Sequence, residues 1–250
     1  MNTAIIAKKL TPAQAEQFEK YFALLLEWNK VMNLTAIVDP DEAALKHFAD
    51  SLTLLPYLDR CGTRTLIDVG TGAGFPGIPL KIMRPELEVT LLDSLEKRIR
   101  FLNAVIGELG LSGIRTIHAR AEDAGRDKAL RGRFDGAAAR AVAPMNVLCE
   151  YCLPFVHAEG RFFAMKGPAE EDFRRALREL GGEVESDELF ELAGGCVEAG
   201  DNTAGEDAGR GEAGGAGASM QRRIICIKKT GATPGKYPRR AGLPAKKPLQ

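Results

Sequence analysis

The first sixty residues carry hydrophobic side chains at the spacing of a helix. A capping sequence, Thr11-Pro12-Ala13-Gln14, precedes the first series, and Asp39-Pro40 precedes the second. Residues 1–62 are therefore expected to form a helical N-terminal extension. The apolar positions are Phe18, Phe22, Leu25 and Trp28 in the first series, and Ala44, Leu45, Phe48, Leu52 and Leu55 in the second.

From residue 63 the pattern changes to short apolar runs that alternate with helical stretches. Such alternation is typical of a mostly parallel sheet with helices on both faces. Residues 63–229 are therefore expected to form a Rossmann-like α/β domain. The predicted strands are 65–69, 89–93, 115–119, 135–140, 161–166 and 222–229, with a helix over 95–109.

The last third of the chain is less regular. Residues 169–190 predict one more helix followed by an acidic stretch. Residues 193–219 are rich in Gly, Ala and Glu without periodicity, which predicts a flexible insertion. Residues 230–250 are dominated by Pro, Gly and Lys, and we expect a basic tail with little fixed structure.

The formal net charge of zero hides an asymmetry along the chain. Nine of the 34 Lys and Arg residues lie in residues 221–250, which hold no Asp or Glu, so residues 1–220 carry 25 basic and 34 acidic side chains. A basic tail on an acidic body indicates either a polyanionic partner or a solvated terminus.

Several functional classes are disfavoured by composition. No stretch approaches the ~18 apolar residues of a membrane span, and residues 1–10 lack the apolar run of a signal peptide. The five cysteines are scattered, which favours a reducing cytoplasm. Cys149 and Cys152 have no partner pair at zinc-ligand spacing, so they are expected to be core residues and no metal site is expected.

The strongest chemical signal is a glycine turn after the first predicted strand. Gly70, Gly72 and Gly74 follow an apolar run, and Asp93 ends the next strand about twenty residues later. This arrangement is typical of a nucleotide site in which the carboxylate meets ribose hydroxyls. Residues 72–77 match G-x-G-x-x-G, so a dinucleotide cofactor is allowed.

Three further features favour S-adenosylmethionine over a dinucleotide. Asp68 adds an acidic group before the turn, Glu122 and Asp123 follow the third strand where an adenine amino group could be met, and a polar turn follows Arg140. A dehydrogenase would also need a substrate domain with acid–base groups, and little of the remaining chain provides one.

These segments resemble one known family, the small-subunit (16S) rRNA guanine-N7 methyltransferases, also called glucose-inhibited division protein B. The similarity covers about residues 20–167, resumes at Arg222 and continues through the basic tail, whereas residues 193–219 depart from it. The matching segments are 68–80, 90–102, 28–35 and 47–51, with shorter matches at Arg140 and at Lys166-Gly167.

The resemblance implies a class I S-adenosylmethionine-dependent fold and methyl transfer to N7 of a guanine in 16S rRNA. N7 carries a lone pair and no proton, so no general base is expected, and catalysis can come from positioning. Arg140 is the candidate catalytic residue, near both cofactor and guanine. The candidate cofactor-binding residues are Gly70, Gly72, Gly74, Phe75, Asp93, Ala121, Glu122 and Arg140, and the candidate substrate-binding residues are Asn33, His47, Lys166, Arg222 and Arg223.

Structural readings of the same residues stay open at this stage. Phe75 and His47 could be packed side chains, Asn33 and Asp93 could cap helices, and Lys166 could be a surface lysine. The alternative functions are methylation of another RNA or a protein, a non-catalytic RNA- or nucleotide-binding regulator, and, more distantly, a nicotinamide dehydrogenase. The expected partner is 16S rRNA within the small subunit or its precursor, and the expected protein is a cytoplasmic monomer.

Overall fold

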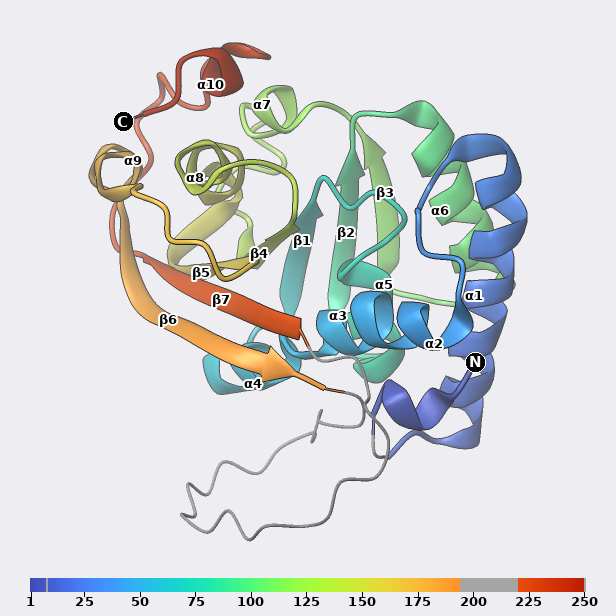
Figure 1. The fold of residues 1–250 in the computed structure, drawn as a ribbon. Coiled ribbons are helices and arrows are strands. Elements are labelled where there is room, and N and C mark those ends of the chain that lie inside the picture. The colour runs from blue at the N-terminus through green and yellow to red at the C-terminus, as the bar shows by residue number, and fades with distance from the viewer. Residues whose placement is uncertain (8, 194–219, 250) are drawn as a thin grey trace, which may run out of the picture.

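The protein is built on one seven-stranded sheet with helices on both faces (Figure 1). The computed structural model describes residues 1–7, 9–193 and 220–249. In the order β3-β2-β1-β4-β5-β7-β6, the first five strands are parallel, and β7 runs antiparallel to both of its neighbours. The predicted α/β class is confirmed. The strands are β1 (Thr65–Val69), β2 (Glu88–Asp93), β3 (Ile114–His118), β4 (Phe134–Arg140), β5 (Val156–Lys166), β6 (Gly182–Leu192) and β7 (Met220–Lys229).

Helices begin where the capping signals predicted them. Thr11 and Gln14 form the capping box before α1, and Asp39 caps α2. A π-helical turn, η2, follows α2 directly. The helices are η1 (Thr3–Ile5), α1 (Pro12–Met32), α2 (Pro40–Ala43), η2 (Ala44–Ala49), α3 (Asp50–Leu52), α4 (Leu55–Cys61), α5 (Gly77–Met83), α6 (Glu96–Glu108), α7 (Ala121–Ala124), α8 (Met145–Cys152), η3 (Leu153–Phe155), α9 (Arg174–Leu180) and α10 (Leu243–Lys246).

Two hydrophobic cores lie on opposite faces of the sheet. Successive residues of β1 point to opposite sides, so Leu66 joins one core and Ile67 and Val69 join the other. The N-terminal helices, α5 and α6 cover the first face, and α8 and α9 cover the second (Figure 1). Residues 1–62 thus share a core with the sheet, and the domain boundary at residue 62 stays a prediction.

The acidic stretch after α9 is a strand, which the set of strands predicted from the sequence omitted. β6 pairs with β7, with Glu183 opposite Lys228, and Arg223 Nε donates to Asp187 at 2.5 Å. Basic residues of β7 neutralise the acidic ones of β6 across the strands. That pairing depends on residues some forty positions away, which local patterning does not reveal.

Residues 230–249, here named the C-terminal strap, are packed on the protein, so the prediction of little fixed structure was wrong. Tyr237 and Leu249 are buried in the core beneath α8 and α9. Arg131 donates to the main-chain oxygens of Thr233 and Tyr237, both at 2.7 Å. Most of the predicted flexible insertion, residues 194–219, lies outside the described residues.

Candidate active site

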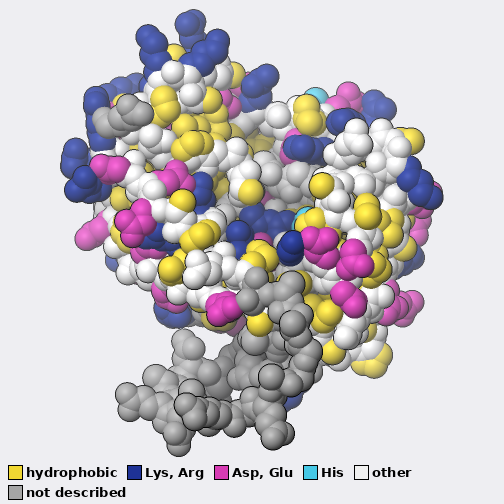
Figure 2. Space-filling view, viewed as in Figure 1, with side chains coloured by type: hydrophobic (Ala, Val, Ile, Leu, Met, Phe, Trp, Pro, Cys, Tyr) yellow, Lys and Arg dark blue, Asp and Glu magenta, His cyan; other side chains and the backbone are white. Residues whose placement is uncertain are grey.

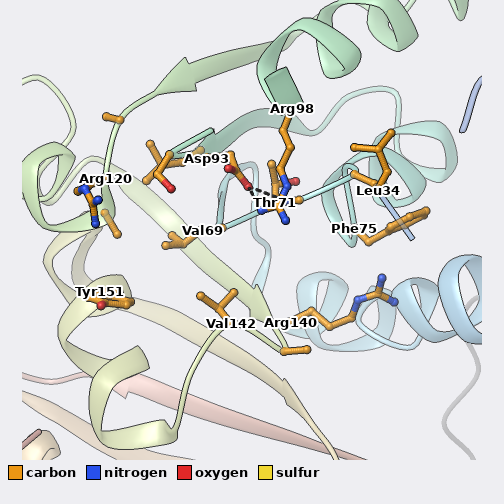
Figure 3. Close-up of a pocket in the computed structure, with 18 of the residues that line it drawn as sticks. Leu34, Val69, Thr71, Phe75, Asp93, Arg98, Arg120, Arg140, Val142 and Tyr151 are labelled. Atoms are coloured by element: carbon orange, nitrogen blue, oxygen red, sulfur yellow. Dashed lines mark hydrogen bonds and ion pairs between the residues drawn. The ribbon is translucent and has the colours of Figure 1, made fainter. Parts of the chain in front are cut away.

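A cavity of about 580 Å³ opens at the carboxyl ends of β1, β2, β3 and β4. Figure 3 shows Arg120 and Tyr151 on one side of it and Leu34, Phe75 and Arg140 on the other, with Val69, Asp93 and Val142 between them. We call the first side the Glu122 end and the second the Arg140 end. The Glu122 end comprises residues 119–122, Tyr151, Gly242 and Ala245, and the Arg140 end comprises Leu34, Thr35, His47, Phe75 and Arg140.

The glycine turn forms the floor of the cavity and is held from two sides. The N–H groups of Gly70 and Thr71 donate to Leu92 O of β2, at 2.8 and 3.1 Å. From below, Asp68 Oδ2 accepts from Thr71 Oγ1 at 2.7 Å and from Gly77 N at 2.8 Å. Burial raises the pKa of Asp68 to about 6, although both hydrogen bonds lower it. This buried carboxyl therefore fixes the turn and does not line the cavity.

Two of the predicted turn glycines line the cavity and the third does not. Gly70 and Gly72 are lining residues with positive φ angles of 71° and 62°. Gly74 is absent from the wall. A Cβ at Gly74 would lie 2.6 Å from both Tyr21 Oη and an Ile78 methyl group. Gly74 is thus required by the packing of the turn against α1, and its predicted cofactor contact gains no support from this position.

Asp93 joins the strand β2 to the glycine turn. Its Oδ2 accepts from Gly72 N at 3.0 Å and from Arg98 Nη1 at 3.2 Å, and its Oδ1 accepts from Leu95 N at 2.9 Å. The side chain is buried yet lines the cavity. α6 has Leu95 at its N-cap, so the structure does not support the alternative reading of Asp93 as the N-cap.

The Glu122 end holds a second buried carboxylate. Glu122 lies in the first turn of α7, and its Oε1 accepts a 2.7 Å hydrogen bond from Gly242 N of the C-terminal strap. Burial, followed by the charge and hydrogen bond of Glu122, raises the pKa of Tyr151 to about 12. A neutral tyrosine and a main-chain N–H therefore both face this carboxylate.

The Arg140 end is aromatic and cationic. The ring of Phe75 stacks on His47 with centroids 4.7 Å apart, and the guanidinium of Arg140 lies 4.9 Å from the centroid of Phe75. His47 Nε2 bonds Thr35 Oγ1 at 2.7 Å. Burial and then the nearby Arg140 lower the pKa of His47 to about 4, so this ring is neutral near pH 7.

Asp50 forms ion pairs with two arginines from distant elements next to the Arg140 end of the cavity. Its buried carboxylate accepts from Arg140 Nη1 at 2.9 Å and from Arg222 Nε of β7 at 2.6 Å. Arg140 Nη1 also donates to the main-chain oxygens of Lys46 and His47 in the π-helical turn. π-helical turns are frequent at functional sites. One carboxylate shared by two guanidinium groups leaves one net positive charge beside the cavity.

Of the five predicted substrate-binding residues, one lines the cavity and four do not. His47 lines the cavity. Asn33 adopts a left-handed conformation that ends α1, as the capping alternative predicted. Lys166 bonds Ala143 O and Glu171, Arg222 bonds Asp50, and Arg223 bonds Asp187. Ala121 and Glu122 line the cavity, and their contact with a cofactor stays a prediction.

Several residues of the site had not been identified from the sequence. Tyr21, whose hydroxyl donates to Ala73 O beneath the turn, lies three residues after Phe18 on the apolar face of α1, so periodicity could have included it. Asp50 is a charged residue within an apolar helical series, which is a usable signal of a paired carboxylate. For Tyr151, Val142 and Gly242, no motif or periodicity in the neighbouring sequence indicated a place in the cavity wall.

The cysteines in the described part of the chain offer one group that could approach a metal ion. Cys149 and Cys152 are fully buried in α8, as predicted for core residues. Among the described residues, Cys61, Glu185 and Cys226 could together approach one ion. Glu185 is already paired with Arg161 through two hydrogen bonds, at 2.8 and 3.1 Å.

The surface around the cavity is basic in two places. Figure 2 shows Lys and Arg side chains in the hollow at the middle of this face and again at the top, over α10. The strap contributes Arg240, Lys246 and Lys247, which are all exposed. No helix in the described part of the chain combines the length and the hydrophobicity needed to cross a bilayer.

Comparisons with known proteins agree with one another. A family profile described as rRNA small subunit methyltransferase G (GidB) matches residues 14–187. A protein named ribosomal RNA small subunit methyltransferase G from Desulforamulus reducens is 46% identical to this chain, over 96% of this chain and 92% of that protein. A protein of the same name from Acetivibrio thermocellus is 48% identical, over 94% of this chain and 89% of that protein. Among solved structures, a SAM-dependent O-methyltransferase from Thermotoga maritima has a TM-score of 0.55 at 16% identity, covering 84% of this chain and 71% of that one, which shows a shared fold.

Proposed function

This chain belongs to the rRNA small subunit methyltransferase G family, and from that premise we propose that it transfers the methyl group of S-adenosylmethionine to N7 of a guanine in 16S rRNA. It is a methyltransferase that uses S-adenosylmethionine and acts on small-subunit rRNA. The atom N7, the residues that carry the reaction, the monomeric state and the cytoplasmic location are the parts that we propose.

The observation that carries the proposal is one cavity with two chemically different ends. Two buried carboxylates, Asp93 and Glu122, line the middle and one end, where neutral donors such as ribose hydroxyls and an adenine amino group would be accepted. The glycine turn beside Asp93 leaves the main chain free to approach a ligand. A cavity of about 580 Å³ is also within the usual size of cofactor sites. These features fit S-adenosylmethionine with its adenosine toward Glu122.

This orientation places the reacting centre at the Arg140 end. When bound, S-adenosylmethionine supplies an electrophilic methyl group on a sulfonium ion. The guanine N7 lone pair forms the new bond to the methyl carbon as the sulfur–carbon bond breaks, and no proton is transferred. His47, with a pKa of about 4, is neutral and has no proton to remove from N7. We assign to Phe75, His47 and Arg140 the task of holding the guanine in line with the methyl group.

The candidate RNA contacts lie around this end and along the strap. Arg140 and Arg222 share Asp50 and leave one positive charge beside the cavity. Arg240, Lys246 and Lys247 are exposed on the strap. Lysine and arginine contacts to phosphates supply most of the affinity for RNA and make that affinity depend on salt. Asn33, Lys166 and Arg223, like Arg222, do not line the cavity and would meet RNA only outside it.

The proposal is tested by methylating small ribosomal subunits that lack the modification, with S-adenosylmethionine labelled in its methyl group. Borohydride reduction followed by aniline cleaves RNA at N7-methylguanine, and we expect one cleavage site in the labelled 16S rRNA. Labelled rRNA that resists cleavage would contradict the N7 assignment. Absence of label, despite measurable binding of S-adenosylhomocysteine, would contradict the rRNA substrate and favour another RNA or a non-catalytic binding role.

A further inference from the structure

The C-terminal strap reaches the cavity from the far end of the chain. It leaves β7 at the edge of the sheet near β6, and its last helix, α10, lies above α8 and beside α7 (Figure 1). Gly242 and Ala245 then form part of the cavity wall at the Glu122 end. The strap is therefore a structural part of the candidate cofactor site and not only a basic appendage.

The strap is anchored by one buried ion pair close to its contact with the cavity. Arg239 donates from N and Nε to Glu150 Oε1, at 2.7 and 2.9 Å, and from Nη2 to Oε2 at 2.6 Å. Glu150 is fully buried in α8. Arg239 Nη1 also donates to Lys247 O at 2.8 Å, which closes the loop that contains α10. Because a bidentate arginine–carboxylate pair has a defined geometry, this loop has a fixed position over the cavity.

Gly242 is the point where the fixed loop meets the cavity. Its N–H donates to Glu122 Oε1 at 2.7 Å, and its φ of 78° lies in the left-handed region that glycine tolerates best. Glu122 is buried and has carboxylate oxygens with room for more than one donor. A hydrogen bond from a fixed main-chain group restricts the rotation of this carboxylate.

We propose that the strap completes the adenine subsite, with Gly242 acting as a positioning residue that orients the Glu122 carboxylate to accept a hydrogen bond from the exocyclic amino group of adenine. This rests on the proposed function, because it takes the cofactor to lie with its adenine at the Glu122 end. Cofactor binding and docking of the strap are then coupled: each favours the other. Removing the strap should therefore weaken cofactor binding, whether or not its basic residues also contact RNA.

The first experiment measures binding of S-adenosylhomocysteine by calorimetry to the full-length protein and to Gly242→Pro. Proline removes the N–H donor and cannot adopt the φ of Gly242, so we expect affinity to fall about tenfold, as for loss of a hydrogen bond to a buried charged group. Gly235→Ala is the matched control within the strap. A Cβ there meets nothing within 4 Å, and unchanged affinity is expected.

A second readout separates positioning from general damage to the fold. The analogue of S-adenosylhomocysteine that lacks the exocyclic amino group should bind the wild-type protein at least tenfold more weakly. In Gly242→Pro and in Glu122→Ala this discrimination should shrink at least threefold. In the variant that carries both Gly242→Pro and Glu122→Ala, the losses of affinity from the two substitutions should not add. Both substitutions remove the hydrogen bond between Gly242 N and Glu122 Oε1.

A third readout needs no variant and covers the case in which Gly242→Pro fails to fold. Amide hydrogen exchange of residues 240–247 should slow at least tenfold when S-adenosylhomocysteine binds the wild-type protein. Unchanged exchange, or unchanged affinity and discrimination in the variants, would overturn the role of the strap while leaving the proposed function intact. A wild-type protein that does not bind S-adenosylhomocysteine at all would instead contradict the proposed function.

Discussion

The two ends of the cavity differ in the buried or half-buried side chain that faces the ligand space, a carboxylate at one end and a guanidinium at the other, and they come from different parts of the chain. At the Glu122 end and beside it, the carboxylates Asp93 and Glu122 accept from main-chain N–H groups, and the wall comes from α7, α8 and the C-terminal strap. At the Arg140 end, arginine and aromatic side chains face the cavity, and the wall comes from the N-terminal extension and β4.

This difference indicates a division of tasks within one site. Carboxylates suit the neutral hydrogen-bond donors of an adenosine, whereas guanidinium groups suit an anionic RNA and the acceptor atoms of a guanine. Substitutions at the Glu122 end and at Asp93 should then change cofactor affinity first. Substitutions at the Arg140 end should change the rate of methyl transfer first. The following predictions test this division, in order of decreasing effect.

The largest effect is expected for Arg140→Met. Loss of the guanidinium should lower the single-turnover rate of methyl transfer at saturating cofactor about 1000-fold, or about 4 kcal/mol, because a positioned charge near the reacting atoms is removed. Binding of S-adenosylhomocysteine should weaken less than tenfold. Arg161→Met, an arginine of β5 paired with Glu185, is the control and should keep the wild-type rate. A wild-type rate in Arg140→Met would contradict the assignment.

The next largest effect is a dependence of the free energy of unfolding on pH, caused by the buried side chain of His47. Its pKa is about 4 in the folded protein, mainly through burial, against an ordinary value of 6.5. The unfolded chain therefore binds more protons between these values, so the free energy of unfolding should rise by about 3 kcal/mol from pH 4 to 6.5. Urea denaturation at several pH values measures this slope, which His47→Gln should lack.

His157 offers a contrast of opposite sign for the same measurement. A hydrogen bond to Asp135 raises its pKa, so it contributes stability at low pH that disappears as the pH rises. Above pH 6.5, His157→Gln should therefore remove a loss of stability with rising pH, whereas below pH 6.5, His47→Gln should make the rise of stability with pH shallower. Equal slopes in the wild-type protein and in His47→Gln would refute a neutral, buried His47.

A third effect separates the middle of the cavity from the Arg140 end. Asp93→Asn keeps one acceptor oxygen for the glycine turn but loses the negative charge that would face ribose hydroxyls. We expect the affinity for S-adenosylhomocysteine to fall about 30-fold, or about 2 kcal/mol, with the transfer rate at saturating cofactor within threefold of wild type. Arg98→Met removes the ion-pair partner of Asp93 from the cavity wall but keeps the Asp93 carboxylate, and it should change affinity less than threefold. If Asp93→Asn lowered the transfer rate more than the affinity for S-adenosylhomocysteine, the proposed division of tasks within the cavity would be contradicted.

The smallest effect concerns the exposed basic residues of the strap. Replacing Arg240, Lys246 and Lys247 together by Ala should weaken RNA binding about tenfold at moderate salt and lower the slope of log affinity against log salt by about 2. Cofactor affinity should not change, because these side chains are exposed while Gly242 stays in place. Lys236→Ala, which removes a partner of Glu179, is the control. Identical salt slopes would exclude RNA contact through these residues.

The glycine turn and Asp93 could be predicted from the sequence because their geometry is local. A turn after one strand and a carboxylate at the end of the next are brought together by the parallel pairing of β1 and β2 alone. For the same reason the capping role of Asn33 could be predicted from its place at the end of the first helical series.

The strap and the Arg140 end could not be predicted in the same way, because they depend on contacts between distant segments. Arg239 meets Glu150 across 89 positions, and Arg222 meets Asp50 across 172. Composition alone made residues 230–250 resemble a solvated tail, since Lys236 and Arg239 meet their acidic partners only in the folded protein. Gly74 shows the converse: at this motif glycine a Cβ would collide with Tyr21 and Ile78, contacts that the motif itself does not reveal.

The most direct test of the account is a crystal structure of this protein with S-adenosylhomocysteine bound. The account predicts ribose hydroxyls on Asp93, adenine between Glu122, Tyr151 and the strap at Gly242, and the sulfur toward Gly70, Phe75 and Arg140. An adenine placed at the Arg140 end, or a ligand that leaves Asp93 and Glu122 without contact, would contradict the division of the cavity on which the proposed function and the role of the strap depend.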